Sequence, residues 1–343
     1  MEYRTFGPEP DGNAEVAELI VQDHRGAEGD GPSSIIGEYT EIEVKLLHML
    51  TTLFKAASNL EELSIEFCED LLELDQYSEL QEYGFRTELA TAISLSRSLQ
   101  RLSLSSLGLR TQCLLHELLA TLVEVNIDFE HNATGNEDLL AALSAHRDTL
   151  ETITAIHVAV NGRAPTQPTP VFPRVRSLSL WHITDLSLES LLVGFPNLRE
   201  LSLGAVALGR DHAFTVSTNW ATPDSEHWSL LTILRGDVAA LDALGLTRSV
   251  RTLEVARGTL HPADCAMLHD VLSGVTPERL LLHVGHYYDR ALLPSAGVSY
   301  EMFVELLNVL DPLWITHFAL DACIPLFASV IAGCVSLLVS PGA

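Results

Sequence analysis

Lysine is nearly absent from this 343-residue chain, which contains 18 arginines but only Lys45 and Lys55. Its 20 basic residues are outnumbered by 46 acidic ones, which gives a formal net charge of −26. Such an excess of negative charge repels nucleic-acid phosphates and anionic membrane surfaces at long range. We therefore expect no nucleic-acid partner and no association with a membrane.

Cysteine is also scarce, with five residues that are widely scattered and form no C-x-x-C pair. Neither a disulfide framework nor a zinc module is indicated by this spacing. Residues 1–39 have no apolar segment of the kind found in a secretory signal peptide. The sequence thus predicts a cytoplasmic or nuclear protein and gives no reason to expect a metal or a cofactor.

Motifs that carry catalysis are missing as well. The chain has no G-x-S-x-G nucleophile elbow, no phosphate-binding loop, no G-x-G-x-x-G, no H-E-x-x-H and no kinase signature. We expect no catalytic residues, and the chain is interpreted as a protein that is not an enzyme.

Leucine, by contrast, is abundant and recurs in the pattern apolar-x-x-apolar-x-apolar, here called the template. In a leucine-rich repeat this pattern marks a short strand whose apolar residues point into the core. Stretches with helical periodicity separate the copies, as at residues 188–192 and 262–274. The predicted fold class is α/β, an irregular leucine-rich-repeat solenoid with a curved parallel sheet inside and helices outside. Strong copies of the template begin at Leu60, Leu99, Leu122, Ile153, Val175, Leu198 and Val250, and weaker ones at Leu231, Leu280 and Ile315.

Three segments are predicted along the chain. Residues 1–39 are acidic and rich in glycine and proline, a composition typical of disorder. Residues 40–320 hold the repeats, and residues 321–343 form an apolar C-terminal tail. The uncharged run from Ala322 to Val339 fits a buried terminal element, a membrane anchor or an aberrant chain end.

The repeats resemble those of the large fungal F-box family. The resemblance is carried by residues 172–180, 195–203 and 228–237 and extends over about 40–320. It implies the substrate-receptor part of a ubiquitin-ligase subunit, an adaptor that selects proteins for modification. No F-box is evident in residues 1–39, so the Skp adaptor is not expected to bind this chain. The alternative is a structural scaffold or sensor with leucine-rich repeats and no link to ubiquitin.

The predicted function is non-catalytic recognition of a protein, which is not identified, on the concave face of the sheet. Trp181 is the outstanding candidate, because exposed tryptophans often dominate the energy of protein interfaces. The alternative is that Trp181 simply folds over His182 or the neighbouring repeat. The candidate partner-binding residues, read from the solvent-facing positions of the template, are Arg101, Ser103, Ser105, Asn126, Asp128, His157, Ser179, Trp181, Glu200, Ser202, Glu254 and His283.

Overall fold

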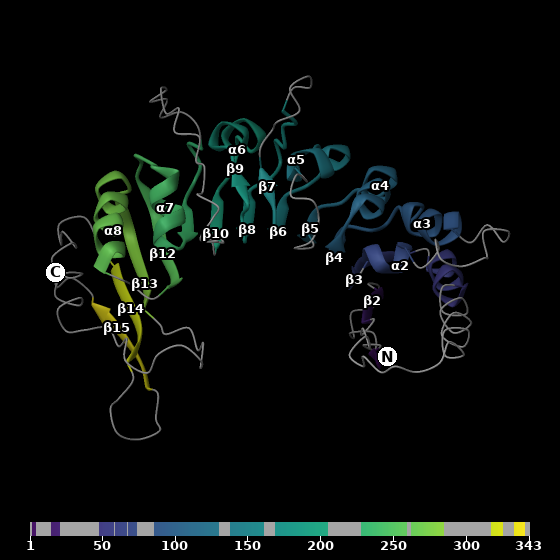
Figure 1. Cartoon of the computed structure of the whole chain (residues 1–343), viewed down its shortest axis with the longest axis horizontal. Helices are drawn as coiled ribbons and strands as arrows, with labels where there is room; N and C mark the ends of the chain where they lie inside the picture. The colour runs from purple at the N-terminus through teal and green to yellow at the C-terminus, as the bar shows by residue number, and fades with distance from the viewer. Residues whose placement is uncertain are drawn as a thin grey trace, which may run out of the picture. The chain divides into compact units, whose positions relative to one another are not determined.

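A computed structural model of the chain divides it into two compact units, Met1–Arg174 and Val175–Ala343 (Figure 1). Each unit combines strands with helices, so the α/β class is confirmed. The residues that the structure describes are 2–4, 15–20, 48–57, 59–66, 68–73, 86–129, 138–160, 169–204, 228–258, 262–284, 317–324 and 333–339.

The first unit is built on a mostly parallel sheet in which β2 to β6 follow one another in chain order. Strand β1 pairs with β2 in the antiparallel sense. The strands are β1 (Glu2–Arg4), β2 (Glu15–Ile20), β3 (Leu60–Ile65), β4 (Arg101–Leu107), β5 (Glu124–Phe129), β6 (Thr152–Ile156) and β7 (Ala159–Val160). A helix covers residues 48–56. The helices that follow it are α2 (Cys68–Glu73), α3 (Arg86–Ser94), α4 (Leu109–Glu117), α5 (Leu139–Ala142) and the 3-10 turn η2 (Ser144–His146).

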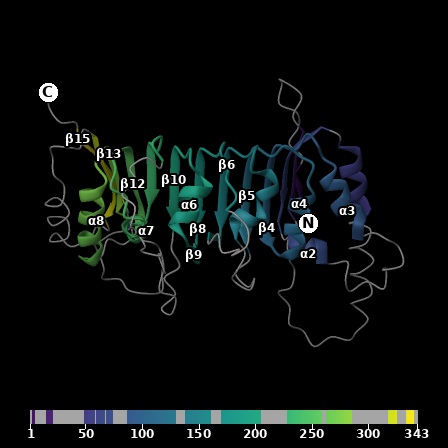
Figure 2. The ribbon, with the colours of Figure 1, turned by 90° about the horizontal axis from the view of Figure 1, so that it is seen from above.

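The second unit has the same plan, with a parallel run β8-β10-β11-β12-β13-β14 and an antiparallel last strand β15 (Figure 2). Its strands are β8 (Ser177–Trp181), β9 (Asp185–Leu186), β10 (Glu200–Gly204), β11 (Ile233–Gly236), β12 (Val250–Gly258), β13 (Pro277–Val284), β14 (His317–Ile324) and β15 (Gly333–Val339). Its helices are α6 (Leu188–Gly194), α7 (Val238–Leu244) and α8 (Pro262–Gly274).

The template residues form the core, as their period predicts. In the copies that begin at Leu60, Leu99, Leu122, Val175, Leu198 and Val250, all three apolar positions are at most 3 % exposed. Residues between them alternate to the solvent-facing side, because successive side chains of a strand point to opposite faces. The weaker copy at Leu231 also forms a strand, with Leu234 aligned to Leu201 of β10.

The phase predicted for the copy at Ile153 is wrong by three residues. Ile153 aligns with Val125 and Ala155 with Ile127, so this copy begins at Leu150. The physical reason is that Ile153, Ile156 and Val158 have the same spacing as Leu150, Ile153 and Ala155, and alanine at the third apolar position is a weak signal. His157 consequently lies just after β6 instead of inside the strand.

A left-handed residue stands two positions after the third apolar residue in three repeats, with φ between 51° and 57°. The three are Ser106 near the end of β4, His157 after β6 and His182 after β8. The residue after each is apolar and buried, namely Leu107, Val158 and Ile183. Backbone strain of this kind often marks a functional site. Because it recurs at the same place in three repeats, we assign it to the turn that directs the chain from the strand toward the helical layer.

Aromatic residues precede the template in the repeats that carry the family resemblance. Phe172, Phe195 and Trp228 each stand three residues before the first apolar position, and each is at most 1 % exposed. The Trp228 indole Nε1 donates a hydrogen bond of 2.7 Å to the carbonyl oxygen of Phe195. These residues therefore pack the core and are not available to a partner.

A buried carboxylate joins two repeats of the first unit. The Glu69 side chain of α2 accepts hydrogen bonds of 2.8–3.1 Å from the backbone N–H groups of Gly108, Arg110 and Thr111 and from the Thr111 hydroxyl. It thereby satisfies the unpaired N–H groups at the start of α4. Burial raises the pKa of the adjacent Cys68 thiol to about 12.

The predicted segments are only partly within the described residues. Strands β1 and β2 lie in residues 1–39, whose other residues lie outside the described part, so disorder there stays a prediction. The apolar tail contains β15, which pairs with β14. Within the described ranges, no helix combines the length and apolar character needed to cross a bilayer.

Candidate functional site

The predicted surface residues fall on the strand faces of both units, and each unit is considered by itself. The first-unit face carries Arg101, Ser103 and Ser105 on β4, Asn126 and Asp128 on β5, and His157 after β6. The second-unit face carries Ser179 and Trp181 on β8, Glu200 and Ser202 on β10, Glu254 on β12 and His283 on β13.

Side chains on the first-unit face bond mainly to the neighbouring strand. Arg101 forms an ion pair of 2.8 Å with Glu62 of β3. Asn126 donates a hydrogen bond of 3.3 Å to the Ser103 hydroxyl. These contacts join adjacent strands along their solvent-facing side, the place where cross-strand pairs stabilise a sheet.

His157 and Asp128 form another short polar contact on this face, with 2.8 Å between Nδ1 and Oδ1. The pair is half-buried, with side-chain exposures of 26 % and 37 %. A histidine and an aspartate in contact also occur in hydrolytic triads, where a nucleophile lies on the far side of the histidine. Because His157 stands directly after β6, the pair is interpreted as a contact that fixes the turn after this strand.

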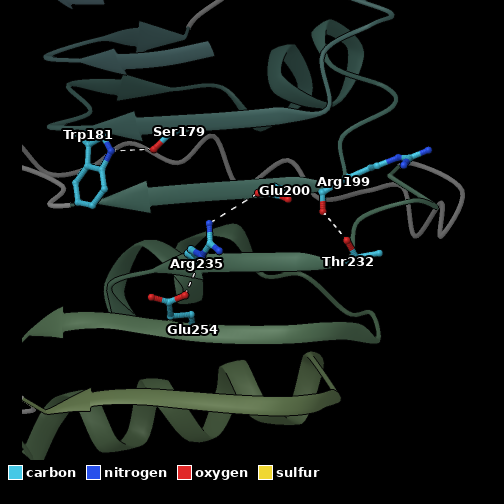
Figure 3. Close-up of polar contacts among 7 residues, drawn as sticks. All are labelled: Ser179, Trp181, Arg199, Glu200, Thr232, Arg235 and Glu254. Carbon is cyan, nitrogen blue, oxygen red and sulfur yellow. Dashed lines mark hydrogen bonds and ion pairs between the residues drawn. The ribbon is translucent and has the colours of Figure 1, made fainter. Parts of the chain in front are cut away.

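The second-unit face contains a charged ladder across four neighbouring strands, and Figure 3 shows its members on the first three. Arg235 of β11 donates from Nε to Glu254 of β12 at 2.8 Å, and its Nη1 lies 3.8 Å from Glu200 of β10. His283 of β13 lies 3.3 Å from the other oxygen of Glu254. All four side chains keep part of their surface exposed, between 26 % and 42 %. The ladder is therefore accessible to a ligand and also holds the strands in register.

Trp181 stands at the carboxyl end of β8, and its side chain is held in one orientation. The indole Nε1 donates a hydrogen bond of 2.8 Å to the Ser179 hydroxyl on the same strand (Figure 3). Its ring covers Gly204 of β10, where an added Cβ would lie 1.8 Å from the Trp181 Cε3 atom. Trp181 nevertheless remains 37 % exposed. Thus it packs over the neighbouring repeat and also presents ring surface to solvent.

Sequence reasoning missed two charged members of these faces. Glu62 occupies the residue just before the second apolar position of the first copy, where Arg101 stands in the next copy. Arg235 lies in the weaker copy at Leu231, whose third apolar position is occupied by Gly236. In that copy Arg235 stands at the same position as Ser202 in the preceding copy, so counting residues from Leu231 would have identified it as solvent-facing.

No metal-binding cluster of three histidine, cysteine or acidic side chains occurs among the described residues. No protein-family model, no curated protein and no solved structure matches this chain. The strands and helices of each unit define an α/β protein with a largely parallel sheet in each unit.

Proposed function

We propose that the chain is a leucine-rich-repeat solenoid that recognises another protein without catalysis. In this proposal the strands form the inner, concave layer and the helices the outer one. The resembling F-box family suggests the substrate-receptor part of a ubiquitin ligase, without the Skp-binding F-box. A structural scaffold or sensor with no link to ubiquitin is the second candidate, and the absence of any matching family favours neither.

The observation that carries the proposal is that the Trp181 indole is held in one orientation and is still partly exposed. Interfaces depend on a few aromatic and arginine anchors surrounded by polar residues. An indole that is already held by Ser179 and Gly204 loses little side-chain entropy on binding. The neighbouring Ser202 and the ladder at Arg235 supply the polar surroundings.

The proposal is tested by affinity capture with quantitative mass spectrometry, using the full chain and two variants as baits. Trp181→Ala removes the exposed indole. Val193→Ala removes an exposed apolar side chain of α6, which is 42 % exposed and belongs to the helical layer. Proteins that are lost with the first variant and retained with the second support recognition through the strand face. If every captured protein is retained by Trp181→Ala, the proposal is wrong.

A further inference from the structure

The charges at the amino-terminal ends of the strands differ between the two units. For each copy of the template, we count the charged side chains in a window of five residues. The window ends at the residue just before the second apolar position. In the first unit these include two arginines, Arg97 and Arg101, and five acidic residues, Glu61, Glu62, Glu124, Asp148 and Glu151. In the second unit they include two acidic residues, Glu200 and Glu278, and five arginines, Arg176, Arg199, Arg248, Arg251 and Arg279. The window of the copy at Val175 also contains Arg174, which is the last residue of the first unit. The second unit thus has a basic edge on a strongly acidic chain.

Four of these arginines form what we call the arginine edge: Arg176, Arg199, Arg251 and Arg279. All four are exposed, and none has a side-chain hydrogen bond or ion pair to another residue in the described part of the chain. Arg199 illustrates their position: its backbone carbonyl accepts a hydrogen bond from the Thr232 hydroxyl, while its guanidinium points away from Glu200 and Arg235 (Figure 3). The remaining arginine, Arg248, bonds to the Ser229 carbonyl.

The arrangement of the arginine edge indicates the shape of its ligand. Arg176, Arg199 and Arg251 occupy the same register position, just before β8, just before β10 and in β12. At this position β11 has Thr232 and β13 has Glu278, and Arg279 lies one residue further along β13. Neighbouring strands lie about 4.8 Å apart, so the row from Arg176 to Arg251 extends over about 14 Å. An extended chain of about four residues covers that distance. A row of this length can contact a chain that carries several negative groups along its whole extent. A single small anion would contact only part of it.

The chemistry of the ligand follows from the guanidinium groups. Arginine binds carboxylates through two parallel N–H donors, and this geometry favours aspartate and glutamate side chains. A nucleic acid is disfavoured, because its long row of phosphates meets the field of a chain with a net charge of −26. A short protein segment experiences mainly the local charge, since charges beyond about 8–10 Å are screened at physiological salt.

We propose that the arginine edge binds an extended, acidic segment of the partner protein, one that carries several aspartate or glutamate side chains. This inference rests on the proposed recognition function, because it assigns the chemistry of the segment that the second-unit face takes. The arginine edge then selects the partner by charge, and Trp181 at the opposite end of the strands provides the apolar anchor.

The test uses fluorescence anisotropy with a labelled peptide of alternating aspartate and glycine, about 12 residues long so that it exceeds the edge. The variant Arg176→Gln/Arg199→Gln/Arg251→Gln removes three positive charges from the arginine edge. The control Lys55→Gln/Arg97→Gln/Arg147→Gln removes three exposed positive charges from the first unit. Thermal unfolding of both variants confirms that the fold is intact.

We expect the first variant to weaken peptide binding by about tenfold or more, and the control by less than about twofold. Equal losses in the two variants, or no binding of the peptide to the wild-type chain, would overturn the inference. So would equally tight binding of single-stranded DNA with the same number of charges, since the site would then take any polyanion. None of these outcomes affects Trp181-dependent capture, so failure of the inference is distinguishable from failure of the proposed function.

Discussion

The Trp181 ring occupies the place where a side chain at Gly204 would stand on the neighbouring strand. The two residues are aligned across β8 and β10, and an added Cβ at Gly204 would lie 1.8 Å from Cε3 of the indole. Glycine at this position therefore allows the tryptophan to lie flat over the next repeat. The pair links the packing of the sheet to the exposed surface that we assign to partner recognition.

Substituting Gly204 tests this link. We expect Gly204→Ala to lower the free energy of unfolding by about 1–2 kcal/mol, because the ring must move away from the new methyl group. In a Trp181→Ala background, Gly204→Ala should lower the free energy of unfolding clearly less, since the ring that clashes with the new methyl group is absent. Urea unfolding of the four proteins in this double-mutant cycle measures the difference. Equal costs in the two backgrounds would show that the ring does not lie over Gly204.

The phase of the template is tested on two adjacent residues of β10. Leu201 is fully buried, so Leu201→Ala should lower the free energy of unfolding by about 2–5 kcal/mol. Ser202 lies on the solvent-facing side, and Ser202→Ala should change it by less than about 0.5 kcal/mol. Urea unfolding again provides the measurement. Similar losses at both positions would mean that the assignment of faces is wrong.

The buried Glu69 carboxylate tests how repeats of the first unit are joined. Glu69→Ala leaves the N–H groups at the start of α4 without their acceptor, and we expect a loss of about 2–3 kcal/mol in stability. Glu117→Ala is the matched control, because it removes an exposed glutamate from the last turn of the same helix. Thermal or urea unfolding should separate the two variants. A Glu69→Ala protein as stable as the control would show that this contact does not hold α4.

The buried His146 predicts a dependence of stability on pH. Burial lowers its pKa below the usual value of 6.5, and the nearby His116 lowers it further. The folded state therefore favours the neutral ring, whose Nε2 donates to the Leu115 carbonyl at 2.8 Å. The unfolded chain takes up a proton near pH 6.5, so the stability contributed by this group is present above that pH and is lost as the pH falls.

We expect the free energy of unfolding to fall between pH 7.5 and pH 5.5, with a contribution from this group of at most about 1.4 kcal/mol per pH unit. His146→Gln removes the titrating group and retains a donor for the Leu115 carbonyl. The difference between the two pH profiles isolates His146 from the other titrating groups. Parallel profiles for the wild type and the variant would contradict the prediction.

The sequence was most informative where a local period determines the structure. Alternation around Leu201 correctly predicted which side chains are buried, because strand geometry acts over a few residues. It failed at Ile153, where Leu150 and Ile156 allowed two phases and Ala155 gave too weak a signal to choose. The α/β class could thus be predicted, whereas the exact register of one repeat could not.

Side-chain contacts between different repeats could not be predicted from the sequence. Glu69 meets Gly108 across 39 residues of chain, and no local pattern marks it as an acceptor for α4. The same holds for Trp181 over Gly204, which depends on how two strands align. Arg235 was missed although the weaker copy at Leu231 was predicted, and Gly236 beside it makes that copy the less regular one.

The central claim is that the strand face at Trp181 binds a protein, and isothermal titration calorimetry with a partner obtained by affinity capture tests it most directly. The dissociation constant is measured for the wild type, Trp181→Ala and Val193→Ala, each with its fold checked by thermal unfolding. The account predicts that Trp181→Ala raises the dissociation constant about 30-fold, equivalent to about 2 kcal/mol, and that Val193→Ala leaves the constant unchanged. Unchanged affinity in a folded Trp181→Ala protein would contradict the account.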